Sequence, residues 1–174
     1  MRPRVGPAVQ IVPYDPNWPH GFEIERQLLA REIGRWIVPG SIEHIGSTAV
    51  PGLASKPVIV IMAGVESLDA SRGAIPDLER HQYNYAPYRT EVMHWFCKPS
   101  PAHRTHHLHL VPLGSPLWLE QLTFRDYLRT HHDAAAEYAA LKRQLAEAHR
   151  FDRDAYTNAK GSFVKRILAR ALRP

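Results

Sequence analysis

The sequence predicts an α+β fold in which one helix precedes a group of strands and further helices close the chain. Segments with the alternating or continuous apolar pattern of strands gather between residues 41 and 112, and apolar residues after Ser115 recur at helical spacing. Strands grouped apart from helices are typical of α+β domains, whereas regular alternation would indicate a doubly wound sheet. Because no repeat or linker divides the sequence, we expect a single domain over residues 1–174.

The first elements expected along the chain are a short strand and a helix. Residues 9–12 alternate and end at a proline, which predicts a short edge strand. Asp15 or Asn17 can cap a helix that begins near Pro19. Apolar residues then recur at helical spacing through about Trp36, which predicts one buried face.

The stretch 41–65 reads as a strand, a Gly-Ser turn, a loop of small residues and a second strand. Residues 58–62 of the second strand are apolar throughout, so we expect it to be buried on both faces. Gly46 and Ser47 form the turn. Glycine permits close approach of the backbone, and successive N–H groups with a hydroxyl can converge on an anion. The turn is a candidate phosphate-binding loop, and an ordinary turn with a capping serine is the alternative.

The remaining elements follow from the same patterns of spacing and capping. We expect a short helix, three strands and then three C-terminal helices. In chain order, the expected segments are a helix over 67–81, strands over 83–89, 92–98 and 106–112, and helices that open at Ser115, at Asp133 and at Asp152 or Asp154.

Composition favours a cytoplasmic protein with anionic partners. The net charge of +5 and the eleven histidines should attract nucleotides or phosphorylated small molecules. The basic residues are scattered and no aromatic–basic motif occurs, which argues against a nucleic-acid partner. A single cysteine, Cys97, fits a reducing compartment, and we expect it to be a buried thiol. We expect no membrane partner, because the longest apolar run is too short to span a bilayer and the basic N-terminus lacks a secretory signal's hydrophobic core.

Five motifs spread over most of the chain carry a family resemblance. They are IEHIGSTAVPGLASKP at 42–57, WFCKP at 95–99, RTHHLH at 104–109, FRDYLR at 124–129 and YTNAK at 156–160. In this order they resemble the signature of the GrpB family, a group within the nucleotidyltransferase superfamily. The resemblance implies a nucleotidyltransferase-like mixed β-sheet with an N-terminal helix and three C-terminal helices packed on it.

The resemblance also implies where phosphates would bind. In nucleotidyltransferases a Gly-Ser pair at the start of a turn grips the triphosphate, and Gly46 and Ser47 match that pair. Lys56 precedes a proline that favours an extended backbone, so its side chain could reach a phosphate; a solvated lysine at a strand end is the alternative. The expected phosphate- or nucleotide-binding residues are Gly46, Ser47, Lys56, Arg104, Arg125 and Lys160.

His107 and His109 are candidates for catalysis and for metal binding. They are two residues apart on an expected strand, so both should project from one face while His106 points to the other. Adjacent imidazoles can ligate a divalent metal, contact phosphate or transfer protons, and a structural pair is the alternative. Glu43 is the third catalytic candidate, as a ligand or as the group that orients a histidine. The implied cofactor is a divalent metal, Mg²⁺ or Mn²⁺, although nitrogen ligands favour Mn²⁺ or Zn²⁺.

The buried strand after the Gly-Ser turn departs from the family pattern. GrpB sequences usually have Asp at the position of Val60, and valine has no atom that can bind a metal. The family resemblance implies a metal-dependent transferase that moves a nucleotidyl or phosphoryl group onto an acceptor. Val60 favours the alternative, a nucleotide-binding sensor or regulatory protein without turnover. GrpB-like domains also occur fused to dephospho-CoA kinase, which suggests coenzyme A or adenine nucleotides as ligands.

Several charged residues have a structural interpretation beside the functional one. We expect Asp126 and Lys142 to form salt bridges that join the helices to one another or to the sheet. For Arg125 such a bridge and a contact with phosphate or nucleobase are both open, and for Lys160 the structural and the functional interpretation are likewise both open. Arg125 and Asp126 are neighbours on a helix and point about 100° apart, so we do not expect them to pair with each other.

Overall fold

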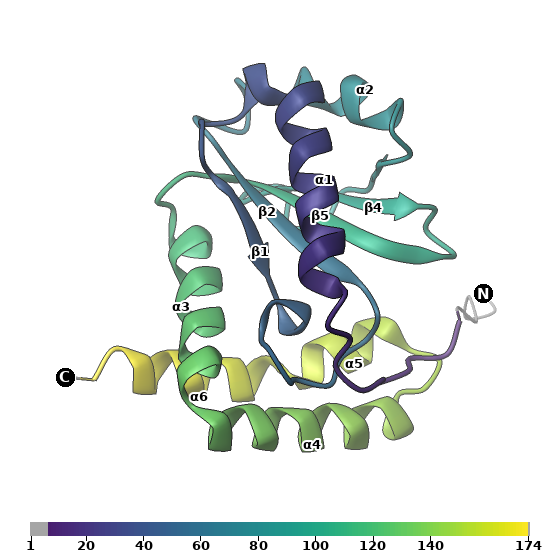
Figure 1. The fold of residues 1–174 in the computed structure, drawn as a ribbon, viewed down its shortest axis with the longest axis vertical. Coiled ribbons are helices and arrows are strands. Elements are labelled where there is room, and N and C mark those ends of the chain that lie inside the picture. Colours follow the sequence, from purple (N-terminus) through teal and green to yellow (C-terminus); the bar gives the residue numbers. More distant parts are fainter. Residues whose placement is uncertain (1–6, 174) are drawn as a thin grey trace.

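The computed structural model describes residues 7–173, and its centre is a five-stranded mixed sheet (Figure 1). The strands are β1 (Ile42–Ile45), β2 (Ile59–Val65), β3 (Asn84–Tyr85), β4 (His94–Pro99) and β5 (Arg104–Pro112). Their order is β1-β2-β5-β4-β3, with β2 and β5 parallel and the other neighbours antiparallel. The predicted α+β class with a mixed sheet is confirmed.

Six helices and two 3₁₀ turns surround the sheet in the described part of the chain (Figure 1). The helices are α1 (Trp18–Glu32), α2 (Ala74–Glu79), α3 (Pro116–Thr130), α4 (His132–Ala148), α5 (Arg153–Ala159) and α6 (Gly161–Ala171). The 3₁₀ turns are η1 (Gly34–Trp36) and η2 (Ser47–Ala49).

The helices form layers on the sheet because each has one apolar face. Helix α1 crosses one face of the sheet, and its Leu29 shares a core with Ile61 of β2 and Leu108 of β5 (Figure 1). Helix α3 packs Leu117 against Val111 of β5 on the opposite face. A separate core joins α3, α4 and α6, which lie together beside the turn η2 at one end of the sheet (Figure 1).

The N-terminal elements follow the predicted order with two differences. Residues 9–12 do not form a strand: Val12 makes one isolated bridge with Ser55, and the proline that follows fixes φ at about −65°, away from the value of an antiparallel strand. Helix α1 ends at Glu32, and the residues up to Trp36 continue as the separate turn η1. Asn17 is the residue before the helix, but its side chain makes no capping hydrogen bond.

Two segments before β4 are shorter than predicted. The helix expected over 67–81 is confined to Ala74–Glu79, preceded by turns in which Ser71 Oγ donates to the Ser67 carbonyl. The strand expected over 83–89 is reduced to Asn84–Tyr85. Buried Cys97 on β4 agrees with the prediction of a structural thiol.

The C-terminal helices confirm some predicted caps and correct others. The Ser115 side chain accepts a hydrogen bond at the start of α3, and Asp152 does the same for α5. Asp133 is not a cap but lies in the first turn of α4. The third predicted helix is two helices that meet at Lys160, because Gly161, a poor helix former, follows directly. The chain therefore ends in four helices instead of three.

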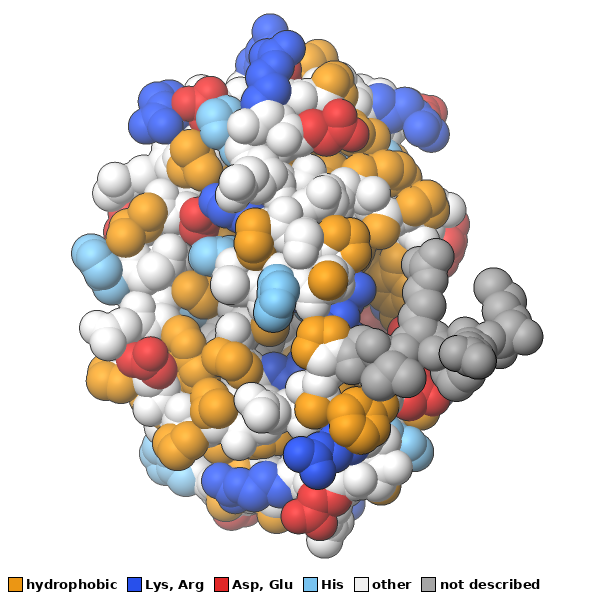
Figure 2. All heavy atoms as spheres, turned by 90° about the vertical axis from the view of Figure 1, so that its right-hand side faces the viewer, with side chains coloured by type: hydrophobic (Ala, Val, Ile, Leu, Met, Phe, Trp, Pro, Cys, Tyr) orange, Lys and Arg blue, Asp and Glu red, His pale blue; other side chains and the backbone are white. Residues whose placement is uncertain are grey.

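The surface carries charges of both signs. On the face shown in Figure 2, lysine and arginine side chains lie towards both ends with acidic side chains among them, and hydrophobic and histidine side chains occupy much of the middle. Among residues 7–173, no helix has both the length and the apolar character needed to cross a bilayer.

Candidate anion-binding site

The Gly-Ser turn follows directly on β1 and depends on glycine. Gly46 has φ 73° and ψ −172°, a backbone region that is open almost only to glycine. A Cβ atom added there would lie 3.4 Å from Cγ2 of Val60 on β2. Ser47 then begins η2, with its side chain on the side of α4.

A buried lysine from α4 reaches this turn. The Nζ of Lys142 donates to Ser47 Oγ at 2.8 Å and also to the carbonyl oxygen of Ala54. The residue is only 2% exposed, although lysine is almost never fully buried without a charged partner. Helix α4 presents it on the same face as Tyr138, whose ring centroid is 4.6 Å from the ammonium.

Two more lysines converge on Tyr156 of α5. The ammonium of Lys160, at the corner between α5 and α6, lies 4.5 Å from the centroid of the Tyr156 ring. That of Lys56, just before β2, lies 5.0 Å from the same centroid. The Tyr156 hydroxyl is buried and has no hydrogen-bond partner among the described residues. This side chain therefore leaves an unused polar atom beside two cations.

The three lysines carry positive charge that the described residues do not neutralise. None of them forms a salt bridge with a carboxylate in residues 7–173, although eleven such bridges occur elsewhere. Burial, followed by the charges of neighbouring basic side chains, lowers the pKa of Lys142 and Lys160 to about 7 and that of Lys56 to about 8. Such a cluster favours a bound anion, which would supply the missing negative charge.

The candidate histidines lie on the sheet face next to this cluster. His107 is the β5 partner of Val60, and His109 is the partner of Met62, so both project from one face as predicted. This is the face opposite α1. His107 packs on Trp95 with centroids 4.9 Å apart. One ring nitrogen of each histidine, Nε2 of His107 and Nδ1 of His109, is buried and has no hydrogen-bond partner within residues 7–173.

The histidines are neutral at pH 7 in this environment. Burial, the neighbouring His109 and then the cations Lys56, Arg104 and Arg153 lower the pKa of His107 to about 2, and burial with Arg89 lowers that of His109 to about 4. Neutral imidazoles can ligate a metal. However, no group of three or more His, Cys, Asp or Glu side chains in the described chain is arranged to hold one. A pair of nitrogens without a carboxylate does not fit Mg²⁺.

Two arginines border the same region. Arg104 of β5 donates to the Pro101 carbonyl at 3.0 Å and lies 5.2 Å from the Trp95 ring centroid. Arg153 of α5 donates to the same carbonyl at 3.2 Å. Their charges help to lower the pKa values of both Lys56 and His107, so these cations surround one area. Of the predicted phosphate ligands, the structure brings together Gly46, Ser47, Lys56, Arg104 and Lys160.

Comparison with known proteins assigns the family. The sequence model described as GrpB protein matches residues 8–170, nearly the whole chain. The chain belongs to the GrpB family. A crystal structure of the conserved protein GrpB from Enterococcus faecalis superposes with a TM-score of 0.84 and 34% sequence identity, covering 94% of this chain and 97% of that one.

Curated relatives agree with this assignment. The glutamate-rich protein GrpB of Alkalihalophilus pseudofirmus is 36% identical over 165 residues, which cover 92% of this chain and 94% of that protein. A UPF0157 protein of Pseudomonas aeruginosa is 39% identical over 170 residues, 94% of this chain and 68% of that protein. A dephospho-CoA kinase of Mycolicibacterium paratuberculosis is 30% identical, and this chain spans 46% of its length.

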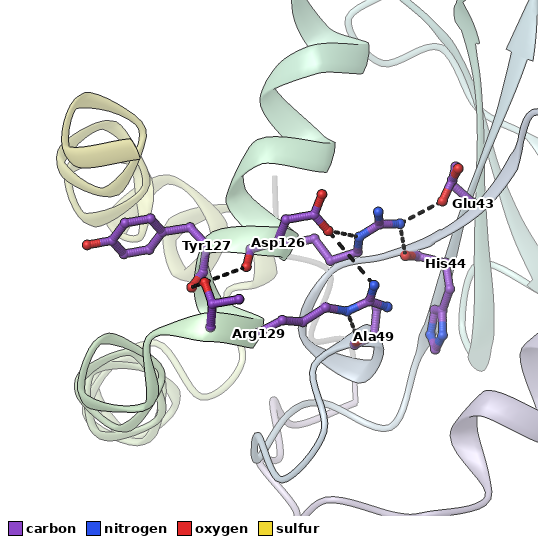
Figure 3. Close-up of polar contacts among 8 residues, drawn as sticks. Glu43, His44, Ala49, Asp126, Tyr127 and Arg129 are labelled. Atoms are coloured by element: carbon purple, nitrogen blue, oxygen red, sulfur yellow. Dashed lines mark hydrogen bonds and ion pairs between the residues drawn. The ribbon is translucent and has the colours of Figure 1, made fainter. Parts of the chain in front are cut away.

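Two of the predicted GrpB site residues lie elsewhere. Glu43 accepts a hydrogen bond from Arg125 Nη1 at 2.7 Å. Strand β2 lies between β1, which carries Glu43, and β5, which carries the histidines, so the two strands are two spacings of about 4.8 Å apart. Arg125 also donates to Asp126 Oδ1 at 2.8 Å. The expectation that these helix neighbours do not pair is wrong, because the arginine side chain is long enough for its Nε to reach the neighbouring carboxylate while its Nη1 reaches Glu43 on β1. Figure 3 shows the carboxylates of Glu43 and Asp126, which both accept hydrogen bonds from the guanidinium of Arg125.

Lys142 is the most buried cation of the site, and the sequence patterns do not identify it as a ligand. The sequence predicts a salt bridge for Lys142, but the residue makes none in the described chain and contacts Ser47 instead. One signal was available: Lys142 follows Tyr138 by four residues, so it lies on the apolar face of a GrpB helix where lysine is out of place. Tyr156 and Arg153 carry no comparable signal.

Proposed function

We propose that the protein binds a nucleotide or a phosphorylated small molecule, with the phosphates held at the lysine cluster of Lys56, Lys142 and Lys160. One observation carries the proposal: three partly or fully buried lysines converge around Ser47 and Tyr156 without a carboxylate partner in residues 7–173. Burial of an unpaired ammonium costs folding free energy, and a bound anion offsets that cost.

Phosphate fits this cluster better than a carboxylate does. A phosphate group presents several strong acceptor oxygens and up to two negative charges, whereas a carboxylate presents one charge. The donors around the site are numerous, since they include three ammonium groups, the Ser47 hydroxyl and the free Tyr156 hydroxyl. The turn that presents Ser47 requires glycine, because Gly46 has φ 73°.

A small molecule is a better candidate ligand than a nucleic acid. The three lysines without a carboxylate partner in residues 7–173 are buried or half-buried within one site. The outer surface mixes lysine and arginine with acidic residues (Figure 2). Nucleic acids are held by extended rows of exposed basic side chains that follow the backbone.

Binding without turnover is the form of this function that the residues favour. A transferase of nucleotidyl or phosphoryl groups needs a metal to neutralise phosphate charge. Val60 lies against Gly46 at the place where the GrpB pattern usually has Asp, and it offers no ligand atom. His107 supplies only a nitrogen there. Transfer to an acceptor is the second candidate, supported by the family resemblance alone.

Adenine nucleotides and coenzyme A precursors are the first ligands to test. The relative named dephospho-CoA kinase matches this chain over part of its length. We therefore choose ATP, dephospho-CoA and inorganic pyrophosphate as probes, because they share phosphate groups and differ in the remainder.

Calorimetric titration of the wild-type protein and of Lys160→Met tests the proposal. We expect saturable binding of at least one probe, and a loss of affinity of about tenfold or more in Lys160→Met, because a charge-assisted hydrogen bond contributes roughly 1.5–3 kcal/mol. Lys165→Met is the matched control, since Lys165 is an exposed lysine one turn further along α6.

Two results would contradict the proposal. One is the absence of binding for every probe, with and without Mn²⁺. The other is equal affinity in the wild type, Lys160→Met and Lys56→Met, which would show that the probes bind away from the lysine cluster.

A further inference from the structure

A cavity of about 320 Å³ opens beside β1, the edge strand of the sheet, between α1 and α3. It lies on the other side of η2 from the lysine cluster: Ala49 lines the cavity, whereas Ser47 of the same turn contacts Lys142. Its volume falls within the range of cavities that hold small organic molecules. Phosphate binding at the lysine cluster makes no use of this space.

One wall of the cavity is flat. Phe22 of α1 stacks on the imidazole of His44, with ring centroids 4.8 Å apart and planes 9° from parallel. The Nε2 atom of His44 lies 2.9 Å from Thr48 Oγ1, which holds the ring in place. Burial and then the charges of Arg129 and Arg125 lower the pKa of His44 to about 4, so the imidazole is neutral at pH 7. This wall suits a planar or aliphatic group.

The opposite wall is formed by two arginines of α3. The Nε and Nη1 atoms of Arg125 are used by Asp126 and Glu43. Arg129 donates from Nε to the Ala49 carbonyl at 2.9 Å, and its Nη1 is 3.8 Å from Asp126, beyond hydrogen-bond distance (Figure 3). The two terminal nitrogens of Arg129 therefore have no hydrogen-bond partner among residues 7–173, and they lie at the end of a planar fork.

The charge balance of this cavity differs from that of the lysine cluster. Two guanidinium groups and one carboxylate, Glu43, line it, and Asp126 of α3 pairs with both arginines, at 2.8 Å from Arg125 and 3.8 Å from Arg129. The charges therefore balance without a ligand, and the cavity offers an anion the terminal nitrogens of Arg129, which have no hydrogen-bond partner among residues 7–173. The side chain of Arg129 is 39% exposed, so a ligand can reach it from solvent. A single available guanidinium fork matches the two oxygens of a carboxylate and pairs with it in bidentate geometry.

We propose that this cavity is a second binding site, which takes a small organic carboxylate with one negative charge. The carboxylate pairs with the terminal nitrogens of Arg129, and a planar or aliphatic body packs against Phe22 and His44. The site is independent of the lysine cluster, because none of the three lysines lines the cavity.

Titration followed by ¹H–¹⁵N correlation spectra tests the second site, with benzoate as the charged probe and benzamide as its uncharged analogue. We expect benzoate to shift the amide signals of residues 44–50 saturably and benzamide to bind at least about tenfold more weakly. Arg129→Gln should lose benzoate affinity by a similar factor, and Arg129→Lys should retain part of it. Arg170→Gln, an exposed arginine of α6, is the matched control and should bind benzoate like the wild type.

Cross-titration separates this inference from the proposed function. Pyrophosphate affinity should be unchanged in Arg129→Gln, and benzoate affinity should be unchanged in Lys160→Met. Equal binding of benzoate and benzamide, equal benzoate affinity in Arg129→Gln and the wild type, or no saturable shift with benzoate up to its solubility would each overturn the second site. None of these results depends on whether phosphates bind at the lysine cluster.

Discussion

The side chain of Val60 lies against Gly46, at the place from which a carboxylate would face both the Gly-Ser turn and His107. Because β2 and β5 are parallel neighbours here, Val60 and His107 project from the same face of the sheet. With a carboxylate in place of Val60, the two adjacent strands would offer a metal one oxygen ligand and one nitrogen ligand. Valine offers no ligand atom, so only the nitrogen of His107 is present.

Replacement of this residue tests whether the scaffold can still hold a metal. We expect Val60→Asp to bind Mn²⁺ at least about tenfold more tightly than the wild type, because a carboxylate is the ligand that the site lacks. Binding can be measured by electron paramagnetic resonance of free Mn²⁺. The substitution should also lower stability by about 1–2 kcal/mol, since Val60 packs against a buried apolar cluster.

Val60→Asn is the control for that prediction, as it has nearly the same shape without the charge. Equal Mn²⁺ affinity in the Asp and Asn substitutions would mean that the metal site cannot be restored at this position.

At the scale of elements, a buried ion pair fastens α1 to the edge of the sheet. Glu25 of α1 accepts hydrogen bonds from Lys98 Nζ at 2.7 Å and from the Tyr83 hydroxyl at 2.6 Å. Burial alone would raise the pKa of Glu25, but the hydrogen bonds from Lys98 and Tyr83 outweigh it and lower the pKa. His106 faces this side of the sheet, as the alternation of β5 predicts.

Loss of the Glu25 carboxylate should destabilise the protein. We expect Glu25→Gln to lower the free energy of unfolding by about 2–4 kcal/mol, because it leaves the Lys98 ammonium half-buried without its counter-ion. Urea denaturation at pH 7 measures this. The effect should fade at acidic pH: the native pKa of Glu25 is below its unfolded value, so its contribution is lost as pH falls through the native pKa.

Glu23→Gln is the matched control on the same helix, because Glu23 pairs with Arg26 at the surface. Equal stability losses in the two substitutions would argue against a special role for the buried pair.

For the whole molecule, the unpaired lysines link anion binding to protons and to stability. The pKa values of Lys142 and Lys160, about 7 in the folded protein, lie below the ordinary value of 10.5. Between about pH 7 and pH 10.5 the unfolded chain binds more protons than the folded chain, so the free energy of unfolding rises with pH over this range. A bound phosphate favours the charged ammonium and raises these pKa values again, so binding takes up protons.

These linkages give two measurable outcomes. Without ligand, the melting temperature of the wild type should rise from pH 7 to pH 9 relative to Lys160→Met, which lacks one of the penalised charges. Calorimetry of pyrophosphate binding at pH 8, in buffers of different ionisation enthalpy, should report net proton uptake that is smaller in Lys160→Met. Proton release, or equal uptake in both proteins, would contradict the linkage.

Local patterns were sufficient for most of the fold. Periodicity placed α1, α3 and α4, and serine and aspartate caps located the starts of α3 and α5. Where local signals are weak, the boundaries were wrong: the segment before β4 has glycine and proline within its helical pattern, and only Ala74–Glu79 remains helical. Helix propensity cannot decide such a segment, because packing against the sheet outweighs it.

The sequence by itself determined the α+β class, the strand–turn–strand unit and the identity of its Gly-Ser turn, since each depends on neighbours along the chain. Tertiary structure alone decided which charged residues meet. Lys142 contacts Ser47, which is 95 residues away in the sequence. Glu43 and Arg125, 82 residues apart, pair with each other outside the predicted site. Contacts over such separations follow from how helices pack on a sheet, and the residue types alone do not encode that geometry.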